Sequence, residues 1–465
     1  MNLPSRISLL TLSFALAACS TAPAPASGIA APTAWQGRTD AGQLPTAQWW
    51  QAFASPELDQ LIQRALANAH DLAAATAQVR QAQARAVIAG APLLPELQLG
   101  LDGSRQHLLH GPGNDPLDVS RSLRTYSTYG LQLTASYELD FWGGLRAARA
   151  SALHELDASR FDRQTVELTL VSAVANAYLQ GLALEEQLRI ARLNLRNARD
   201  VLNLVQTRQQ AGSATRLELA QQRSLVAAQE RQVPLLEQQW QDSRVTLATL
   251  LGDPVQALPA SHQALASVQW PGIGSGVPSE LLSRRPDIAA AEARLAAANA
   301  NIQVARAAML PKLTLGASLG TGANAFAEVL DSSAYTLTAG LLAPVFNNGR
   351  LRAERQLAEA EQAQLLENYR SSILAGFADV EKALNAIHGV DRQRLWQDQE
   401  VQEARTAFDL AQQRYGAGAE TLLTVLETQR TLYGAQDQQA QLRLARLQGS
   451  VALYKALGGG WRVQR

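Results

Sequence analysis

Few side chains in this chain have the type and spacing that catalysis or metal binding requires. Gly316, Ser318 and Gly320 fit the G-x-S-x-G pattern of hydrolases, but that pattern places its serine on a turn between a strand and a helix. Ser318 lies instead on the polar side of an alternating segment, which predicts a strand. His107 and His110 stand in a polar loop without an acidic or thiol partner at helical spacing. We therefore expect no catalytic residue, no metal site and no cofactor, and the chain is not predicted to be an enzyme.

The overall charge of the chain excludes one class of partner. Its 465 residues include 41 basic and 41 acidic side chains, a formal net charge of +0, so no surface for nucleic acid is expected. Hydrophobic residues make up 47% and aromatic residues only 5%, which favours extended helices over disorder or a compact core. Beyond the N-terminus no segment approaches the roughly 18 uncharged apolar residues that a membrane-spanning helix requires. Without a G-x-x-x-x-G-K phosphate-binding motif, any energy must come from a partner.

The single cysteine, Cys19, follows a short basic region at Arg6 and an apolar segment over residues 7–15. The four residues that end at Cys19, Leu-Ala-Ala-Cys, resemble the cleavage box of bacterial lipoproteins. This predicts a signal peptide over residues 1–18, covalent diacylglyceryl and N-acyl lipid on Cys19, and a lipidated flexible tether over residues 19–47. Ser20 stands where Asp would favour the inner membrane, so the outer membrane is expected. The alternative is an ordinary secretory signal with a coincidental cysteine.

The sequence contains an internal duplication. Residues 94–100 recur at 310–316, the pair Ala211-Gly212 recurs as Ala417-Gly418, and the pair Leu251-Gly252 recurs as Leu457-Gly458. Each copy predicts a helix, two strands and then two long helices. The expected boundaries are a first repeat over 48–252, an inter-repeat segment over 253–277, a second repeat over 278–458 and a C-terminal tail over 459–465.

The expected strands alternate between apolar and polar residues. The apolar positions lie in four series: Leu97 to Leu101, Tyr129 to Leu139, Leu313 to Leu319, and Leu337 to Leu341. A strand that separates lipid from water requires this pattern of one apolar and one polar face. A half-buried sheet in a soluble domain would show the same alternation, so the strands alone leave both interpretations open.

The expected helices are too long for one globular core. Residues 145–211 contain no proline, and at 1.5 Å per residue this segment would span about 100 Å. Coiled-coil steps of three and four residues connect Leu188, Ala191, Leu195, Ala198, Leu202 and Val205, and also Ala440, Leu444, Leu447, Val451 and Tyr454. Helices of this kind must pack side by side as a long bundle or tube. Four strands cannot close a membrane barrel, so closure requires further copies: two would give eight strands and three would give twelve.

The residues with the most specific pattern are 284–288, 305–315 and 453–461. On these the chain, from about Trp49 to Trp461, resembles outer membrane factors of the TolC and OprM/NodT type, the exit ducts of tripartite efflux pumps. It departs from the family pattern at His70 and Gln303. The resemblance implies a homotrimer with a twelve-stranded outer-membrane β-barrel, a periplasmic α-barrel of coiled-coil helices, and an equatorial domain built from residues 55–65, 252–285 and the C-terminal tail. It also implies two partners, a periplasmic adaptor protein and an inner-membrane pump.

Candidate gate residues lie where the chain reverses between paired long helices. Gly212 and Gly418 suit the left-handed position that ends a helix, and in the resembling family these tips close the periplasmic end and dock the adaptor. The predicted tip residues are Gly212, Thr215, Arg414, Gly418, Glu420, Thr421 and Leu423. For Glu420 two compatible roles are open: three copies could converge near a pore axis and raise one another's pKa, or each could complement the positive end of a helix dipole. Arg414 either pairs with an acid at the tip or is solvated.

The sequence therefore predicts a mainly α protein with membrane β-strands that acts as a passive, lipid-anchored outer-membrane channel. Its expected cargo is drugs or other small toxic solutes, delivered by the pump and adaptor. The alternative within the class is an exit duct for type I protein secretion. A structural periplasmic coiled-coil lipoprotein is a rival from another class, although it would lack the lipid-facing strand pairs.

Overall fold

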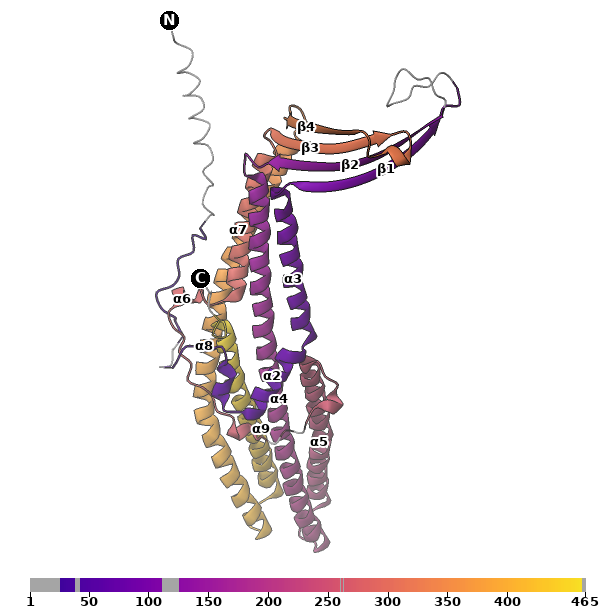
Figure 1. Cartoon of the computed structure of the whole chain (residues 1–465). Helices are drawn as coiled ribbons and strands as arrows, with labels where there is room; N and C mark the ends of the chain where they lie inside the picture. The colour runs from indigo at the N-terminus through magenta and orange to yellow at the C-terminus, as the bar shows by residue number, and fades with distance from the viewer. Residues whose placement is uncertain (1–25, 38–41, 111–124, 260, 262, 462–465) are drawn as a thin grey trace. The chain divides into compact units, whose positions relative to one another are not determined.

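The computed structural model describes residues 26–37, 42–110, 125–259, 261 and 263–461 (Figure 1). The predicted signal peptide and Cys19 lie outside the described residues. Two compact units are present: the first contains Gln78–Ser159 and Ala291–Tyr369, and the second contains Gly28–Ala77, Arg160–Ala290 and the chain from Arg370 onward. Among the described residues, no helix combines the length and apolar character needed to cross a membrane.

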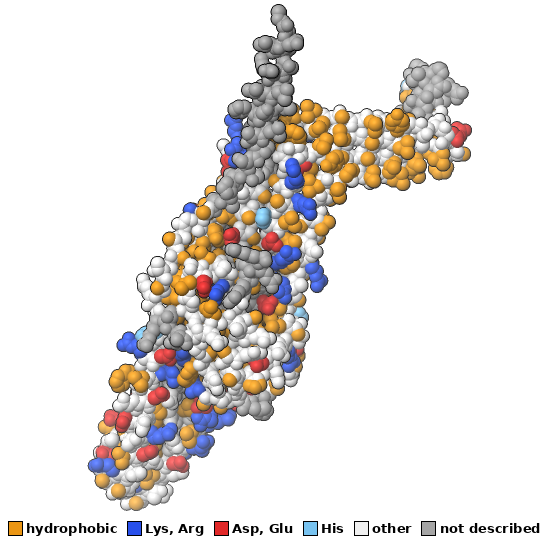
Figure 2. Space-filling model, turned by 60° about the vertical axis from the view of Figure 1, so that its left-hand side comes forward, with side chains coloured by type: hydrophobic (Ala, Val, Ile, Leu, Met, Phe, Trp, Pro, Cys, Tyr) orange, Lys and Arg blue, Asp and Glu red, His pale blue; other side chains and the backbone are white. Residues whose placement is uncertain are grey.

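The first unit holds one four-stranded antiparallel sheet in the order β1-β2-β3-β4 (Figure 1). Its strands are β1 (Glu96–His107), β2 (Thr125–Leu139), β3 (Lys312–Ala323) and β4 (Ser333–Leu342). The register places Leu99 opposite Leu133, Leu133 opposite Leu319, and Leu319 opposite Tyr335. Because side chains alternate along each strand, this row puts all four predicted apolar series on one face. Hydrophobic side chains cover the strands in Figure 2.

The duplicated order of elements is the one predicted. The first repeat runs α3 (His70–Gly90), β1, β2, α4 (Gly144–Gln210) and α5 (Arg216–Leu251), and the second runs α7 (Pro286–Ala307), β3, β4, α8 (Arg350–Gly416) and α9 (Leu422–Ala456). Both α4 and α8 are 67 residues long. The start of α4 is fixed by Asp140, whose carboxylate accepts hydrogen bonds from the backbone N–H groups of Leu145 (3.0 Å) and Arg146 (2.9 Å).

The buried seam of α4 differs from the predicted one at two positions. Ala191, Ala198 and Val205 are buried as expected, but Leu195 and Leu202 are only partly buried. Asn194 and Val201 take their places in the interior. The reason is that α4 packs against α9 as well as α5. Val201 belongs to a core cluster with residues of α5, α8 and α9, including Leu225, Phe408, Val425 and Tyr433. The seam predicted for α9 is correct except for the half-buried Leu444.

The second unit also contains the shorter elements near the repeat boundaries. These are η2 (Trp49–Phe53), α2 (Pro56–Asn68), α6 (Pro278–Leu281) and the 3-10 turns η4 (Val255–Ala257) and η5 (Leu265–Ser267). The ring of Trp49 stacks on Tyr454 of α9 with centroids 4.9 Å apart. Arg443 of α9 donates hydrogen bonds to the carbonyls of Leu265 and Ala266. Residues 49–53 and the inter-repeat segment are thus attached to the C-terminal helix.

Candidate functional site

The two chain reversals of the second unit have the same backbone geometry. Gly212 follows α4 and Gly418 follows α8, each with φ of 77°. The next residue closes the helix end in both: the N–H of Ser213 donates to the carbonyl of Arg208, and the N–H of Ala419 donates to that of Arg414, each at 2.8 Å. A hydrogen bond from the sixth residue back to the first, together with a glycine in the left-handed conformation, defines the Schellman motif. The structure therefore places both predicted glycines at left-handed positions between paired helices.

The first reversal, residues 211–215, starts the next helix with a capping box. The backbone N–H of Glu218 donates to Thr215 Oγ1 (3.2 Å), and the N–H of Thr215 donates to Glu218 Oε2 (2.6 Å). Two backbone donors that α5 cannot satisfy internally are paired in this way. Thr215 is thus a helix cap, a role the sequence analysis did not give it.

In the second reversal, residues 417–421, the acidic residue Glu420 stands before the cap residue Thr421 and makes different hydrogen bonds. Glu420 Oε1 accepts hydrogen bonds from the N–H of Thr421 (3.0 Å) and from Thr424 Oγ1 (3.1 Å). Its Oε2 lies 3.8 Å from Nε of Arg414. The two hydrogen bonds, helped by the charge of Arg414, hold the pKa of Glu420 below its ordinary value. Within one chain, Glu420 therefore accepts hydrogen bonds at the start of α9. Arg414 lies near the carboxylate of Glu420, which is the paired one of the two alternatives for this residue.

A contact between the last turns of α4 and α8, next to the two reversals, was missed in the sequence. The guanidinium of Arg208 lies 4.5 Å from the ring centroid of Tyr415, and Arg208 Nη1 donates a hydrogen bond to the carbonyl oxygen of Tyr415. Tyr415 is only 2% exposed, and burial together with the charge of Glu218 raises the pKa of its hydroxyl. Polar residues surround both positions in the sequence, so only the packing of α8 against α4 reveals that they meet.

One apolar side chain at each reversal is left exposed. Leu217 is 66% exposed and Leu423 is 58% exposed. Each is the second residue of the helix that follows the reversal. The two leucines thus occupy matching, exposed positions of the two hairpins.

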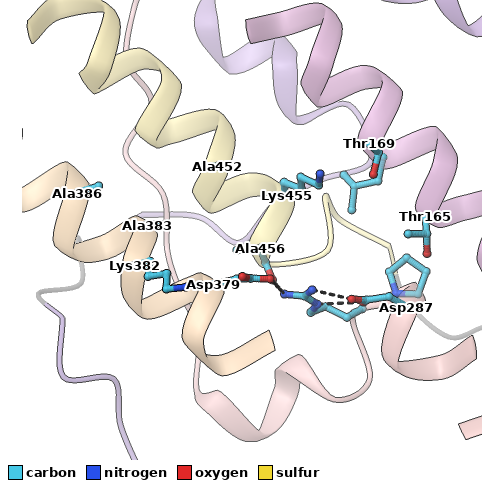
Figure 3. A pocket seen from close by; sticks show the side chains of 13 residues that line it. Thr165, Thr169, Asp287, Asp379, Lys382, Ala383, Ala386, Ala452, Lys455 and Ala456 are labelled. Carbon is cyan, nitrogen blue, oxygen red and sulfur yellow. Dashed lines mark hydrogen bonds and ion pairs between the residues drawn. The ribbon is translucent and has the colours of Figure 1, made fainter. Parts of the chain in front are cut away.

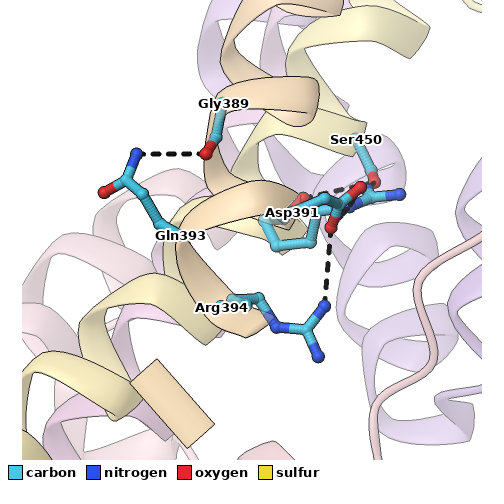
Figure 4. A network of polar contacts seen from close by, with 6 residues as sticks. Gly389, Asp391, Gln393, Arg394 and Ser450 are labelled. Atoms are coloured by element: carbon cyan, nitrogen blue, oxygen red, sulfur yellow. Dashed lines mark hydrogen bonds and ion pairs between the residues drawn. The ribbon is translucent and has the colours of Figure 1, made fainter. Parts of the chain in front are cut away.

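A buried polar network joins α8 and α9 away from the reversals (Figure 4). Nε of Arg446 donates to both carboxylate oxygens of Asp391 at 2.8 and 3.0 Å, and its Nη1 donates to Ser450 Oγ at 2.7 Å. Arg394 also lies 3.4 Å from Asp391. A buried charge is tolerated only when it is paired in this way. The network links the two helices, and it too was missed in the sequence.

The residues that resembled catalytic or metal-binding motifs lie apart from these features. Ser318 is in the middle of β3, paired with Thr134 and Thr336 on the polar face of the sheet, and no helix follows it. His107 Nδ1 contacts Thr125 Oγ1 at 2.5 Å, and His110 is exposed. Within the described part of the chain, no group of three His, Cys, Asp or Glu side chains could hold a metal ion.

Comparison with known proteins agrees with this arrangement. The sequence model of the outer membrane efflux protein family matches residues 61–253 and 277–459. The chain is 71% identical to the pyoverdine export outer membrane protein OpmQ of Pseudomonas putida, covering 100% of this chain and 99% of that one. It is 60% identical to OpmQ of Pseudomonas aeruginosa, covering 99% and 98%. The solved structure of the outer-membrane channel OprN matches with a TM-score of 0.88 at 26% identity, covering 95% of this chain and 100% of that one. The resemblance seen in the sequence is confirmed, and the chain belongs to the outer membrane efflux protein family, whose channels share this fold.

Proposed function

We propose that this outer membrane efflux channel is the exit duct of a tripartite export system and that its cargo is pyoverdine. The observation that carries the choice of cargo is the pair of relatives, 71% and 60% identical over nearly the whole chain, that are named for pyoverdine export. Drugs and other small toxic solutes remain the cargo to be tested against it. The channel itself is passive, and an inner-membrane pump supplies the energy.

The sheet supports assembly as a trimer. Its apolar face runs across all four strands, and β1 and β4 each have one edge without a strand partner among the described residues. An open strand edge in lipid leaves backbone groups unpaired at a cost of several kcal/mol each. Three copies joined edge to edge give a closed barrel of twelve strands with the apolar face toward lipid. The acylated Cys19 adds a lipid anchor in the outer membrane, and the paired long helices form the α-barrel in the periplasm.

The two reversals support the roles of gate and docking site. The exposed Leu217 and Leu423 provide apolar contacts for a periplasmic adaptor protein. The contact of Arg208 with Tyr415 ties the two hairpins together, and Glu420 with Arg414 holds the second reversal closed. Docking of the adaptor moves the hairpins apart and opens the duct.

Export of pyoverdine is tested in a deletion strain with and without the restored gene. We expect pyoverdine, quantified by mass spectrometry, to fall in the culture supernatant and rise in the periplasmic extract, and to recover with the wild-type gene. The L217E/L423E double variant should reach the outer membrane without restoring export, because charged tips cannot make apolar contacts with the adaptor. The L217M/L423M double variant, which keeps the apolar surface, should restore it.

Two results would contradict this proposal. Unchanged pyoverdine distribution together with restorable hypersensitivity to dyes, detergents or antibiotics would assign the cargo to toxic solutes. Full export by the L217E/L423E variant would place adaptor docking elsewhere.

A further inference from the structure

The second unit contains a cavity of about 450 Å³ between four helices (Figure 3). It is lined by α4, by the start of α7, by α8 and by the end of α9, and its polar lining residues include Thr169, Arg285, Asp287, Asp379, Lys382 and Lys455. The cavity lies about 30 or more residues from the reversals along α8 and α9, so it is separate from the gate in sequence.

The lysines of the chain are concentrated at this cavity. Only three of the 41 basic residues are lysines: Lys312, Lys382 and Lys455. Lys312 is paired with Glu138 at 3.4 Å in the first unit. Lys382 and Lys455 are both exposed, and in the described residues neither ammonium has an ion-pair or hydrogen-bond partner. Two of the three lysines thus present free cations to one cavity.

Both carboxylates of the cavity are hydrogen-bonded to Arg285. Arg285 donates to Asp287 from Nε (3.0 Å) and Nη2 (2.6 Å), and to Asp379 from Nη1 (2.9 Å). Burial opposes the charge of Asp287, but Arg285 outweighs it and lowers the pKa of that carboxyl. With three cations against two carboxylates, the lining keeps an excess of positive charge, and Lys382 and Lys455 remain available to a ligand.

The described residues Gln36 and Gly37 of the N-terminal segment contact α8 beside Lys382. Glu381, the neighbour of Lys382, accepts hydrogen bonds from the N–H groups of Gln36 (2.7 Å) and Gly37 (2.9 Å). Lys382 lies about a quarter-turn away from it around the helix. Trp396, two heptads beyond Lys382, shares its face and is 69% exposed. In the described residues, Trp396 and Lys382 are thus both exposed on this face of α8.

We propose that this cavity binds a small anionic solute through a carboxylate or phosphate group as the solute passes through the channel. The inference rests on the proposed function and adds the charge class of the cargo. The ammonium groups of Lys382 and Lys455 pair with the anion, and the hydroxyl of Thr169, which lies beside Lys455 in Figure 3, donates a hydrogen bond to it. Arg285 holds the two acids away from the ligand.

Acetylation of the lysines tests the proposal on the full-length channel in detergent. An amine-reactive acetylating reagent is applied with citrate, with inorganic phosphate, or with sodium chloride at equal ionic strength, and modification of each lysine is followed by mass spectrometry. At about ten times the Kd of the ligand the free site falls to about a tenth, so labelling of Lys382 and Lys455 should slow about tenfold. Lys312 serves as the internal control and should not change. Slowing by citrate alone or by phosphate alone assigns the preferred anion.

Several outcomes would overturn the proposal. Equal slowing at all three lysines would show an effect of the medium, and no slowing at Lys382 and Lys455 would exclude binding. Calorimetric titration with the same anion should show binding lost in K382Q/K455Q and kept in K312Q, and binding kept in both would also overturn it. These measurements do not involve export. If the L217E/L423E variant binds the anion normally but does not restore pyoverdine export, the defect concerns only the gate or docking site. If the wild-type channel binds the anion but its deletion leaves pyoverdine export unchanged, only the proposed cargo is contradicted.

Discussion

The two hairpin reversals have the same backbone and different acids. Both end a helix with a glycine at φ 77° and begin the next with a threonine cap. In the first, Glu218 stands three residues after the cap and bonds back to it. In the second, Glu420 stands immediately before the cap and also approaches Arg414. Duplication has kept the residues that the backbone requires, while the position of the charge has changed.

The interior of the two reversals differs as well. Tyr415 is buried in the last turn of α8, whereas the corresponding residue of α4, Gln209, is half-buried. The second hairpin therefore supplies most of the core of the tip, and Arg208 of the first packs on Tyr415. From this we infer that residues of the second hairpin contribute most of the stability of the tip and that those of the first contribute less.

The largest expected change in stability comes from replacing Tyr415 with alanine, compared with the same replacement at the corresponding Gln209. Tyr415→Ala leaves a cavity in the cluster of Val205, Phe408 and Leu422 and should destabilise the tip by about 3 kcal/mol. Gln209→Ala should cost less than about 0.5 kcal/mol. Hydrogen exchange of the two reversals in the assembled channel checks this, since about 3 kcal/mol corresponds to about a hundredfold loss of protection.

Tyr415→Phe separates packing from polarity in the same experiment. The hydroxyl of Tyr415 is buried without a hydrogen-bond partner in the described residues, so its removal should leave protection unchanged or higher. Equal losses in Tyr415→Ala and Gln209→Ala would refute the division of roles between the hairpins.

The architecture was largely predictable because it follows from periodicity. Alternation along the strands predicted the face of residues such as Leu99 and Leu319, and the register observed in the sheet pairs those faces. The length of α4 followed from the absence of proline over residues 145–211. The seam of α4 was wrong at Leu195 and Leu202 because a helix that packs on two neighbours buries a wider face than one coiled-coil partner would.

The candidate site was predictable only where the backbone demands a residue type. Gly212 and Gly418 could be placed because a left-handed residue favours glycine. The contact between Arg208 and Tyr415 joins residues 207 positions apart, and no local pattern identifies such a pair. The same holds for Arg285 and Asp379, whose separation along the chain hides the cavity they share with the two lysines.

Removing the threonine caps should change helix stability by an intermediate amount, and by different amounts in the two hairpins. Thr215→Ala removes one half of a capping box and should destabilise the start of α5 by about 1 kcal/mol. Thr421→Ala should cost about half as much, because Thr421 Oγ1 accepts from the N–H of Thr424 at a long 3.5 Å and Glu420 still accepts from the backbone. Hydrogen exchange of the first turns of α5 and α9 measures both. Thr406→Ala, an exposed position within α8, is the control, and a larger loss in Thr421→Ala than in Thr215→Ala would contradict the assigned caps.

The smallest effect concerns the charge of Glu420 and decides between its two proposed roles. Its hydrogen bonds lower its pKa within one chain. A carboxylate of this kind contributes stability above its ordinary pKa, and that contribution is lost as pH falls through the lowered value. If capping dominates, resting conductance in a planar bilayer stays constant down to the ordinary pKa of 4.5 and rises only at lower pH.

Three carboxylates converging at a pore axis would act in the opposite direction. Their repulsion raises the pKa of the closed tip, so protonation would stabilise the closed form, and conductance would fall as the pH is lowered, beginning above pH 4.5. Glu420→Gln should remove the pH dependence in either case, and Glu427→Gln, which changes an exposed acid seven residues further along α9, should keep it. A pH dependence that survives in Glu420→Gln would show that another group closes the tip. Whether conductance rises or falls as the pH is lowered therefore tells whether the acid of the second reversal acts within one hairpin or across the three.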